Sequence, residues 1–180
     1  IIQTQRRYDL NLDKETYFKI IRMKTAALFA VAGELAAALN GCSEDVQARL
    51  HGYGDKLGTA YQIYDDVLDL VGDEEAVGKT LGTDLEKGKL TLPILNLLES
   101  ATEAQRTKLN RLLISQQPIE VSVLAGIADY QGAIDSAVQT ACGILEDARA
   151  DLMILASSDS VTALEQVTRY LEARLRKCLH

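Results

Sequence analysis

The sequence predicts an all-α protein whose long helices pack as a bundle. Only 2 of its 180 residues are Pro, and residue types that favour helix, such as Ala, Leu, Glu, Lys and Gln, are abundant. Apolar residues recur in steps of three and four along several segments, whereas no segment alternates as a strand does. Hydrophobic residues make up 47% and charged residues 25% of the chain, as in ordinary globular domains.

The first long helix is expected over residues 14–39. Asp13 is a suitable N-cap, and Asn40-Gly41 is a typical stop. The expected apolar seam of this helix comprises Tyr17, Ile21, Leu28, Val31 and Leu35, with Lys24 inside it. A lysine in such a seam either extends along the helix to water or faces a cleft that takes an anion. Thr25 beside it can add a hydroxyl donor.

A second long helix is expected over residues 44–71, with Ser43 as its N-cap. Residues 72–90 are then predicted to form a long loop, because four glycines stand there among acids and lysines. Such a loop in a compact domain is usually functional. Further helices are expected over residues 91–98, 102–115, 129–156 and 160–178, the second of them opened by a capping box of Thr102 and Gln105.

The second long helix carries the residues that point to chemistry. Gln62, Asp65, Asp66 and Asp69 share one helical face, opposite the apolar seam. A solvated face is one interpretation. However, Asp is a poor helix former and like charges one turn apart repel, so the row favours a cation site. Carboxylate ligands without His or thiolate suit Mg²⁺, Mn²⁺ or Ca²⁺.

Composition excludes several other functions. The net charge of −7 argues against nucleic-acid binding, which needs a basic surface. No apolar run reaches the length of a membrane span, and no P-loop or nucleophilic triad is visible. Cys42, Cys142 and Cys178 form no paired motif, which favours a reducing compartment. A cytoplasmic location is expected, although the chain does not begin with Met and a targeting segment could precede it.

Two blocks of the sequence resemble trans-isoprenyl diphosphate synthases. Residues 58–69 read GTAYQIYDDVLD, followed by GK at 78–79, GTDL at 82–85 and GKLTLP at 88–93. These resemble the second aspartate-rich region of that family, and KTAALF at 24–29 resembles its upstream Lys-Thr motif. The resemblance covers nearly the whole chain. It implies the helical bundle of the isoprenoid synthase type around a deep cavity.

The resemblance also implies a set of functional residues. Asp65, Asp66 and Asp69 would hold Mg²⁺ together with the substrate diphosphate. Lys24 and Lys79 would contact the diphosphate and stabilise it as it leaves. The same pocket would be lined by further substrate-binding residues, namely Thr25, Gln62 and Lys89. The implied reaction ionises an allylic diphosphate, and the double bond of isopentenyl diphosphate attacks the resulting cation.

The family's first aspartate-rich motif has no counterpart here, because the chain contains no second Asp-Asp pair. Residues 1–180 therefore resemble the C-terminal part of a single synthase domain, expected to be inactive alone and a homodimer when intact. Geranylgeranyl or longer products are favoured over farnesyl diphosphate. The alternatives are a terpene cyclase on the same fold, a non-catalytic helical subunit that partners a complete synthase, and an acidic helical domain with no site.

Overall fold

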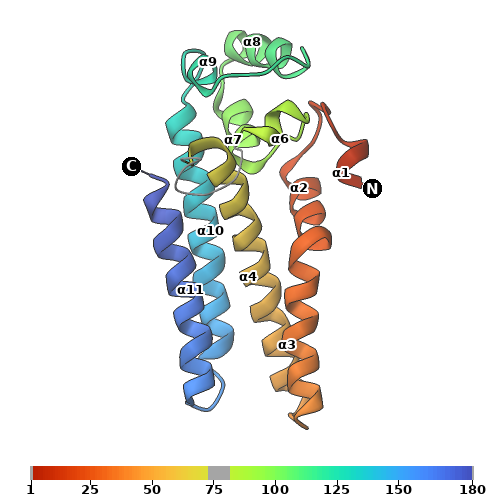
Figure 1. Ribbon diagram of the computed structural model, residues 1–180, viewed down its shortest axis with the longest axis vertical. Helices are drawn as coiled ribbons and strands as arrows, with labels where there is room; N and C mark the ends of the chain where they lie inside the picture. Colours follow the sequence, from red (N-terminus) through yellow and green to blue (C-terminus); the bar gives the residue numbers. More distant parts are fainter. Residues whose placement is uncertain (1, 73–81, 180) are drawn as a thin grey trace.

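The structure is a computed structural model, and it describes residues 2–72 and 82–179. All the regular secondary structure among these residues is helical, with no strand, so the predicted all-α class is confirmed. Four long helical segments lie side by side along the long axis of the molecule, and short helices gather at one end (Figure 1). The long segments are α3 (Ala27–Leu39), α4 (Glu44–Val71), α10 (Tyr130–Leu152) and α11 (Asp159–Lys177).

The predicted helix over residues 14–39 is present as a continuous run with one irregular turn. It consists of α2 (Lys14–Ile21), a π-helical turn η1 (Arg22–Ala26) and α3. Asp13 caps its start by accepting a hydrogen bond from the Thr16 backbone N–H at 2.7 Å. Within η1, the backbone N–H of Ala27 donates to the carbonyl of Arg22, five residues earlier. This turn widens the helix by one residue.

The predicted apolar seam of this run is correct in α2 and wrong in α3. Tyr17 and Ile21 are buried, but Leu28, Val31 and Leu35 are exposed. The extra residue in η1 rotates everything that follows it, so that Ala26, Ala30 and Ala37 face inward instead. We call the exposed row of Leu28, Val31, Leu35 and Leu39 the α3 stripe.

Helix α4 is the central element of the bundle. It packs against α3 on one side and α10 on the other, with α11 beside α10 (Figure 1). Its apolar seam is buried at Tyr53, Leu57, Ala60, Ile63 and Val67. Asp151 of α10 forms ion pairs with both Arg49 and Lys56 of α4, which hold α10 against the N-terminal half of α4.

The short helices cover one end of the bundle. They are α1 (Ile2–Gln5), α6 (Thr83–Glu86), α7 (Leu92–Ser100), α8 (Glu103–Leu113) and α9 (Val121–Ala125). The capping box of Thr102 and Gln105 forms as predicted. The predicted loop over residues 72–90 contains the short helix α6 within its described part. Over the described ranges, no helix combines the length and apolar character needed to cross a membrane.

Candidate functional site

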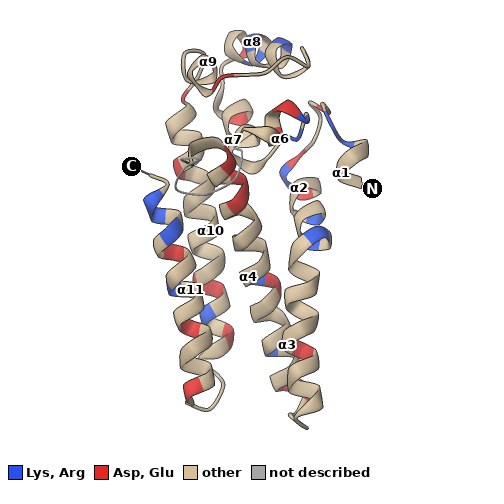
Figure 2. Cartoon of the chain, viewed as in Figure 1, with Lys and Arg blue, Asp and Glu red and all other residues tan. Residues whose placement is uncertain are grey.

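The aspartate row lies on the part of α4 nearest the short helices. Figure 2 shows acidic residues there, close to α6, and basic residues on the neighbouring α2–α3 run. Asp66 and Asp69 are only 4% and 6% exposed, and Asp65 is half-buried. A solvated helix face would leave all three carboxylates in water, so that interpretation does not describe this row.

The π-helical turn brings Lys24 and Thr25 next to the aspartate row. Gly58 of α4 permits the approach, because a Cβ at this position would lie 2.7 Å from the Cα of Ala26. Lys24 is exposed, and its positive charge still reaches Asp66, whose pKa it lowers. π-helical turns recur at functional sites because they redirect side chains out of the regular helical array.

A chain of hydrogen bonds links the two segments. The Thr25 hydroxyl donates to Gln62 Oε1 at 2.6 Å. Gln62 Nε2 donates to Asp66 Oδ1 at 2.9 Å and to Asp65 Oδ2 at 3.4 Å. The Tyr17 hydroxyl donates to Asp66 Oδ2 at 2.7 Å. A hydroxyl has one proton, so Thr25 can donate to a phosphate oxygen only if it releases Gln62.

Asp66 has an unusual ionisation. Burial raises its pKa to about 7, and the hydrogen bonds from Tyr17 and Gln62 act in the opposite direction. The negative charge of Asp84 also raises the pKa of Asp66, whereas the positive charge of Lys24 lowers it. Desolvation exceeds the other effects because the carboxyl is almost fully removed from water.

Asp69 connects α4 to α6. Its side-chain Oδ2 accepts from the Asp84 backbone N–H at 3.0 Å, and its carbonyl accepts from the Gly82 N–H at 2.7 Å. Gly82 has a φ of +73°, a conformation that favours glycine. Lys89 forms an ion pair with Asp84. The structure therefore joins Lys89 to the aspartate row through Asp84.

The predicted site residues fall into three groups. The structure brings together Thr25, Gln62, Asp65 and Asp66 by hydrogen bonds, and it places Lys24, Asp69 and Lys89 around them. Lys79 lies outside the described residues. The sequence analysis did not identify two residues that contact the aspartate row, namely Tyr17 and Asp84. Tyr17 seemed an ordinary seam residue, and the available signal was that a buried tyrosine hydroxyl needs a partner.

The carboxylates do not form a closed metal cage by themselves. Within residues 2–72 and 82–179, no three His, Cys, Asp or Glu side chains converge in a way that could hold an ion. Asp65, Asp66 and Asp69 nevertheless present carboxylate groups, which are hard oxygen donors, on one stretch of α4. Mg²⁺ typically takes one or two carboxylates and completes its octahedron with water and phosphate oxygens. This donor set fits such a partial site.

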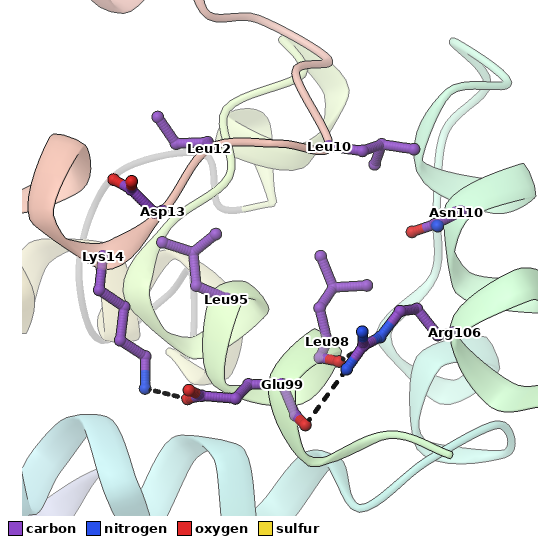
Figure 3. A pocket seen from close by; sticks show the side chains of 9 residues that line it. All are labelled: Leu10, Leu12, Asp13, Lys14, Leu95, Leu98, Glu99, Arg106 and Asn110. Atoms are coloured by element: carbon purple, nitrogen blue, oxygen red, sulfur yellow. Dashed lines mark hydrogen bonds and ion pairs between the residues drawn. The ribbon is translucent and has the colours of Figure 1, made fainter. Parts of the chain in front are cut away.

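A separate pocket of about 350 Å³ lies between α2, α7 and α8 (Figure 3). Leu95 and Leu98 form part of its wall, and Lys14 pairs there with Glu99. The Arg106 guanidinium donates to the carbonyls of Leu98 and Glu99 at 3.0 and 3.4 Å. Its basic groups are thus engaged with neighbours, and none of the predicted site residues lines it.

Comparison with known proteins places this site in a family context. Residues 1–130 match the family model described as polyprenyl synthetase. The chain is 36% identical over 165 residues to the short chain isoprenyl diphosphate synthase of Methanothermobacter thermautotrophicus. That alignment covers 92% of this chain and 51% of the relative, so the chain spans about half the length of the curated protein that it matches.

Solved structures agree with the sequence match. The decaprenyl diphosphate synthase from Rhodobacter capsulatus is similar with a TM-score of 0.86 at 32% identity, over 97% of this chain and 55% of that one. A geranylgeranyl pyrophosphate synthase from Corynebacterium glutamicum, complexed with isoprenyl diphosphate and magnesium, has a TM-score of 0.79 at 26% identity. That match covers 91% of this chain and 48% of the other.

Proposed function

Because the chain belongs to the polyprenyl synthetase family, we propose that the protein is a trans-prenyltransferase that joins isopentenyl diphosphate to an allylic diphosphate. The proposed product is geranylgeranyl diphosphate or a longer polyprenyl diphosphate. One observation carries the proposal, namely the hydrogen-bonded contact between the aspartate row of α4 and the Lys24-Thr25 turn. Carboxylates that suit a divalent cation thereby lie beside groups that suit a phosphate.

Mg²⁺ is the proposed cofactor. Asp65 and Asp69 would hold it, with Asp66 as a ligand directly or through water, and substrate diphosphate would complete its coordination. The magnesium and isoprenyl diphosphate in the Corynebacterium glutamicum structure support this choice. When bound, the ion would supply positive charge that neutralises the leaving diphosphate.

The basic residues take complementary roles. Lys24 and Lys79 bind the diphosphate and stabilise its growing charge as the allylic C–O bond breaks. Thr25 and Gln62 line the same pocket. The double bond of isopentenyl diphosphate attacks the allylic cation and a C–C bond forms, which leaves a carbocation on the joined chain. A carbon next to this cation then loses a proton to the released diphosphate, and the C–H electron pair forms the new double bond. Lys89 supports the diphosphate and its metal shell, and its ion pair with Asp84 is consistent with that role.

The intact protein is proposed to be larger than this chain. In this proposal residues 1–180 form the C-terminal part of one isoprenoid synthase domain, and the remaining part supplies the first aspartate-rich motif. The chain's coverage of about half of its relatives supports this view, as does the exposed α3 stripe, an apolar surface that further helices could cover.

Two further proposals concern the assembly and the location of the intact protein. We propose that it is a homodimer and that it works in the cytoplasm, where its free thiols would stay reduced. The 180-residue chain alone is proposed to lack turnover. A non-catalytic subunit is disfavoured, because the matched relatives are named as synthases.

The test is Mg²⁺-dependent binding of an allylic diphosphate to the intact protein. Asp65→Ala and Asp69→Ala should each weaken binding by at least about 100-fold, or close to 3 kcal/mol. Asp147→Ala is the matched control, since Asp147 is an exposed acid on α10 and its loss changes the net charge equally. Unchanged binding in both site variants would contradict the proposal.

A further inference from the structure

Tyr17 is a buried tyrosine that points at the aspartate row from another helix. Its side chain is 3% exposed, and its hydroxyl donates to Asp66 Oδ2 at 2.7 Å. It stands two turns before Lys24 on the α2–η1 run. Tyr17 and Asp66 both line a small pocket of about 20 Å³, which Arg6 and Lys89 also line. The tyrosine is therefore a buried donor held directly against this carboxylate oxygen.

The other oxygen of Asp66 is also engaged. Gln62 Nε2 donates to Oδ1 at 2.9 Å, which turns the Gln62 carbonyl oxygen toward the Thr25 hydroxyl at 2.6 Å. The orientation of the amide is thus set at both ends, because its NH₂ group faces carboxylates and its oxygen faces a donor. Tyr17, Asp66, Gln62 and Thr25 are thus joined by three consecutive hydrogen bonds.

The series begins and ends on the same helical run. Tyr17 and Thr25 lie on α2 and η1, whereas Gln62 and Asp66 lie one turn apart on α4. The hydrogen bonds therefore form a bracket with two attachment points on each segment. A single contact would allow α4 to turn about its axis relative to the Lys-Thr turn, but two contacts eight residues apart resist that rotation.

We propose that Tyr17 is a positioning residue of the metal–diphosphate site. Its hydroxyl acts through Asp66 and Gln62 to hold the aspartate row and the Lys24-Thr25 turn in the relative orientation that binding requires. In this role Asp66 is a brace between two helices as well as a carboxylate of the row. The inference rests on the function proposed above and deepens it.

The Tyr17 hydroxyl stays protonated and can therefore donate its hydrogen bond to Asp66. Burial first, and then the negative charge of Asp66, raise the pKa of Tyr17 well above its usual value, so the hydroxyl keeps its proton. Partners that orient a metal-binding carboxylate typically change metal affinity by about 10- to 100-fold when they are removed. Tyr17→Phe removes only the hydroxyl and is the direct test.

The matched control is Tyr53→Phe. Tyr53 is also buried in the bundle, at 4% exposure, and its hydroxyl donates to the Leu164 carbonyl at 2.8 Å, far from the aspartate row. Both variants lose one buried hydroxyl and one hydrogen bond. A purely structural role for Tyr17 predicts similar losses of thermal stability and equal, small effects on binding.

The measurement is a calorimetric titration of the intact protein with Mg²⁺ at a fixed concentration of inorganic diphosphate. Tyr17→Phe should raise the Mg²⁺ midpoint by about tenfold, and Tyr53→Phe by less than about twofold. Equal shifts in the two variants, or no shift in Tyr17→Phe, would overturn the inference. Wild-type protein that shows no Mg²⁺-dependent binding would instead defeat the proposed function.

A double-variant comparison tests the route through Asp66. If Tyr17 acts through this carboxyl, adding Tyr17→Phe to Asp66→Asn should change the Mg²⁺ midpoint by less than about twofold, because the two residues are coupled. A further tenfold change would show that Tyr17 acts elsewhere and would overturn the inference. Should Tyr17→Phe fail to fold, Thr25→Val opens the same bracket at its other end and must give a shift in the same direction.

Discussion

At the scale of single residues, Asp66 links stability to pH. Its pKa in the folded protein is about 7, raised mainly by burial from an ordinary value of 3.8. Between these two values the folded state holds a proton that the unfolded state has released. The protonated carboxyl therefore contributes stability that is complete below pH 3.8 and is lost as the pH rises through 7. Over the whole window the loss amounts to at most about 4 kcal/mol.

Asp66→Asn should remove this dependence. Without divalent ions, wild-type protein should lose up to about 3 kcal/mol between pH 5 and 8 through this carboxyl, whereas the variant should lose less by that amount. Denaturant unfolding with a chelator at the two pH values measures the difference. The exposed Asp147 provides the control, and Asp147→Asn should keep the wild-type slope. An Asp66→Asn slope equal to wild type would contradict the burial argument.

Residue identity and helical periodicity predicted how the aspartate row of the candidate site is arranged along α4. Asp65, Asp66 and Asp69 were expected on one face because their spacing determines it, and the structure keeps them on one stretch of α4. The partner of each carboxyl could not be predicted. Whether a seam tyrosine such as Tyr17 meets an apolar side chain or a carboxylate depends on how two helices cross, and the spacing within one helix does not contain that information.

At the scale of helices, the π-helical turn decides which residues face the core. The N-cap residues Ser43 and Asp13 correctly predicted where α4 and the α2–α3 run begin, because an N-cap hydrogen bond is local in sequence. The predicted seam of α3 was wrong, because an extra residue in η1 breaks the regular helical period on which the prediction depended. Small residues then face α4, and Gly58 allows the close approach of Ala26.

Gly58→Ala should separate the two helices at the site. The added Cβ would lie 2.7 Å from the Ala26 Cα, an overpacking that costs about 1–3 kcal/mol. The Gly-to-Ala gain in helix propensity offsets about 1 kcal/mol of this. We expect a lower unfolding free energy together with weaker Mg²⁺-dependent diphosphate binding, measured by denaturation and calorimetry.

Gly143 gives the matched control for this substitution. It lies inside α10, and a Cβ there would meet nothing within 4 Å. Gly143→Ala should therefore stabilise the protein by up to about 1 kcal/mol through helix propensity alone and leave binding unchanged. If Gly58→Ala were equally stabilising, the close approach of α4 to η1 would not be a constraint.

At the scale of the whole molecule, α3 presents a row of apolar side chains that no described part of the chain covers. The α3 stripe includes Leu28 at 76% and Leu39 at 78% exposure. The arrangement of the helices could be anticipated only through the family resemblance, since periodicity gives each helix a buried face but not its neighbour. The exposure of the stripe could not be anticipated, because the expected seam assigned Leu28, Val31 and Leu35 to the core.

The stripe gives a prediction that depends on the length of the protein. Leu28→Gln with Leu35→Gln should change the stability of the 180-residue chain by no more than about 0.5 kcal/mol each, because both side chains are exposed. In the intact protein, where we propose that further helices cover the stripe, each change should cost about 2–3 kcal/mol of buried apolar surface. Denaturant unfolding of both lengths measures the contrast.

Met153 and Tyr170 give the control, because they are exposed at 84% and 69% and lie away from the stripe. Met153→Gln with Tyr170→Gln should therefore be nearly neutral in both lengths of the protein. Equal effects of the leucine pair in the two lengths would mean that nothing covers the stripe and would remove one support for the proposed larger domain.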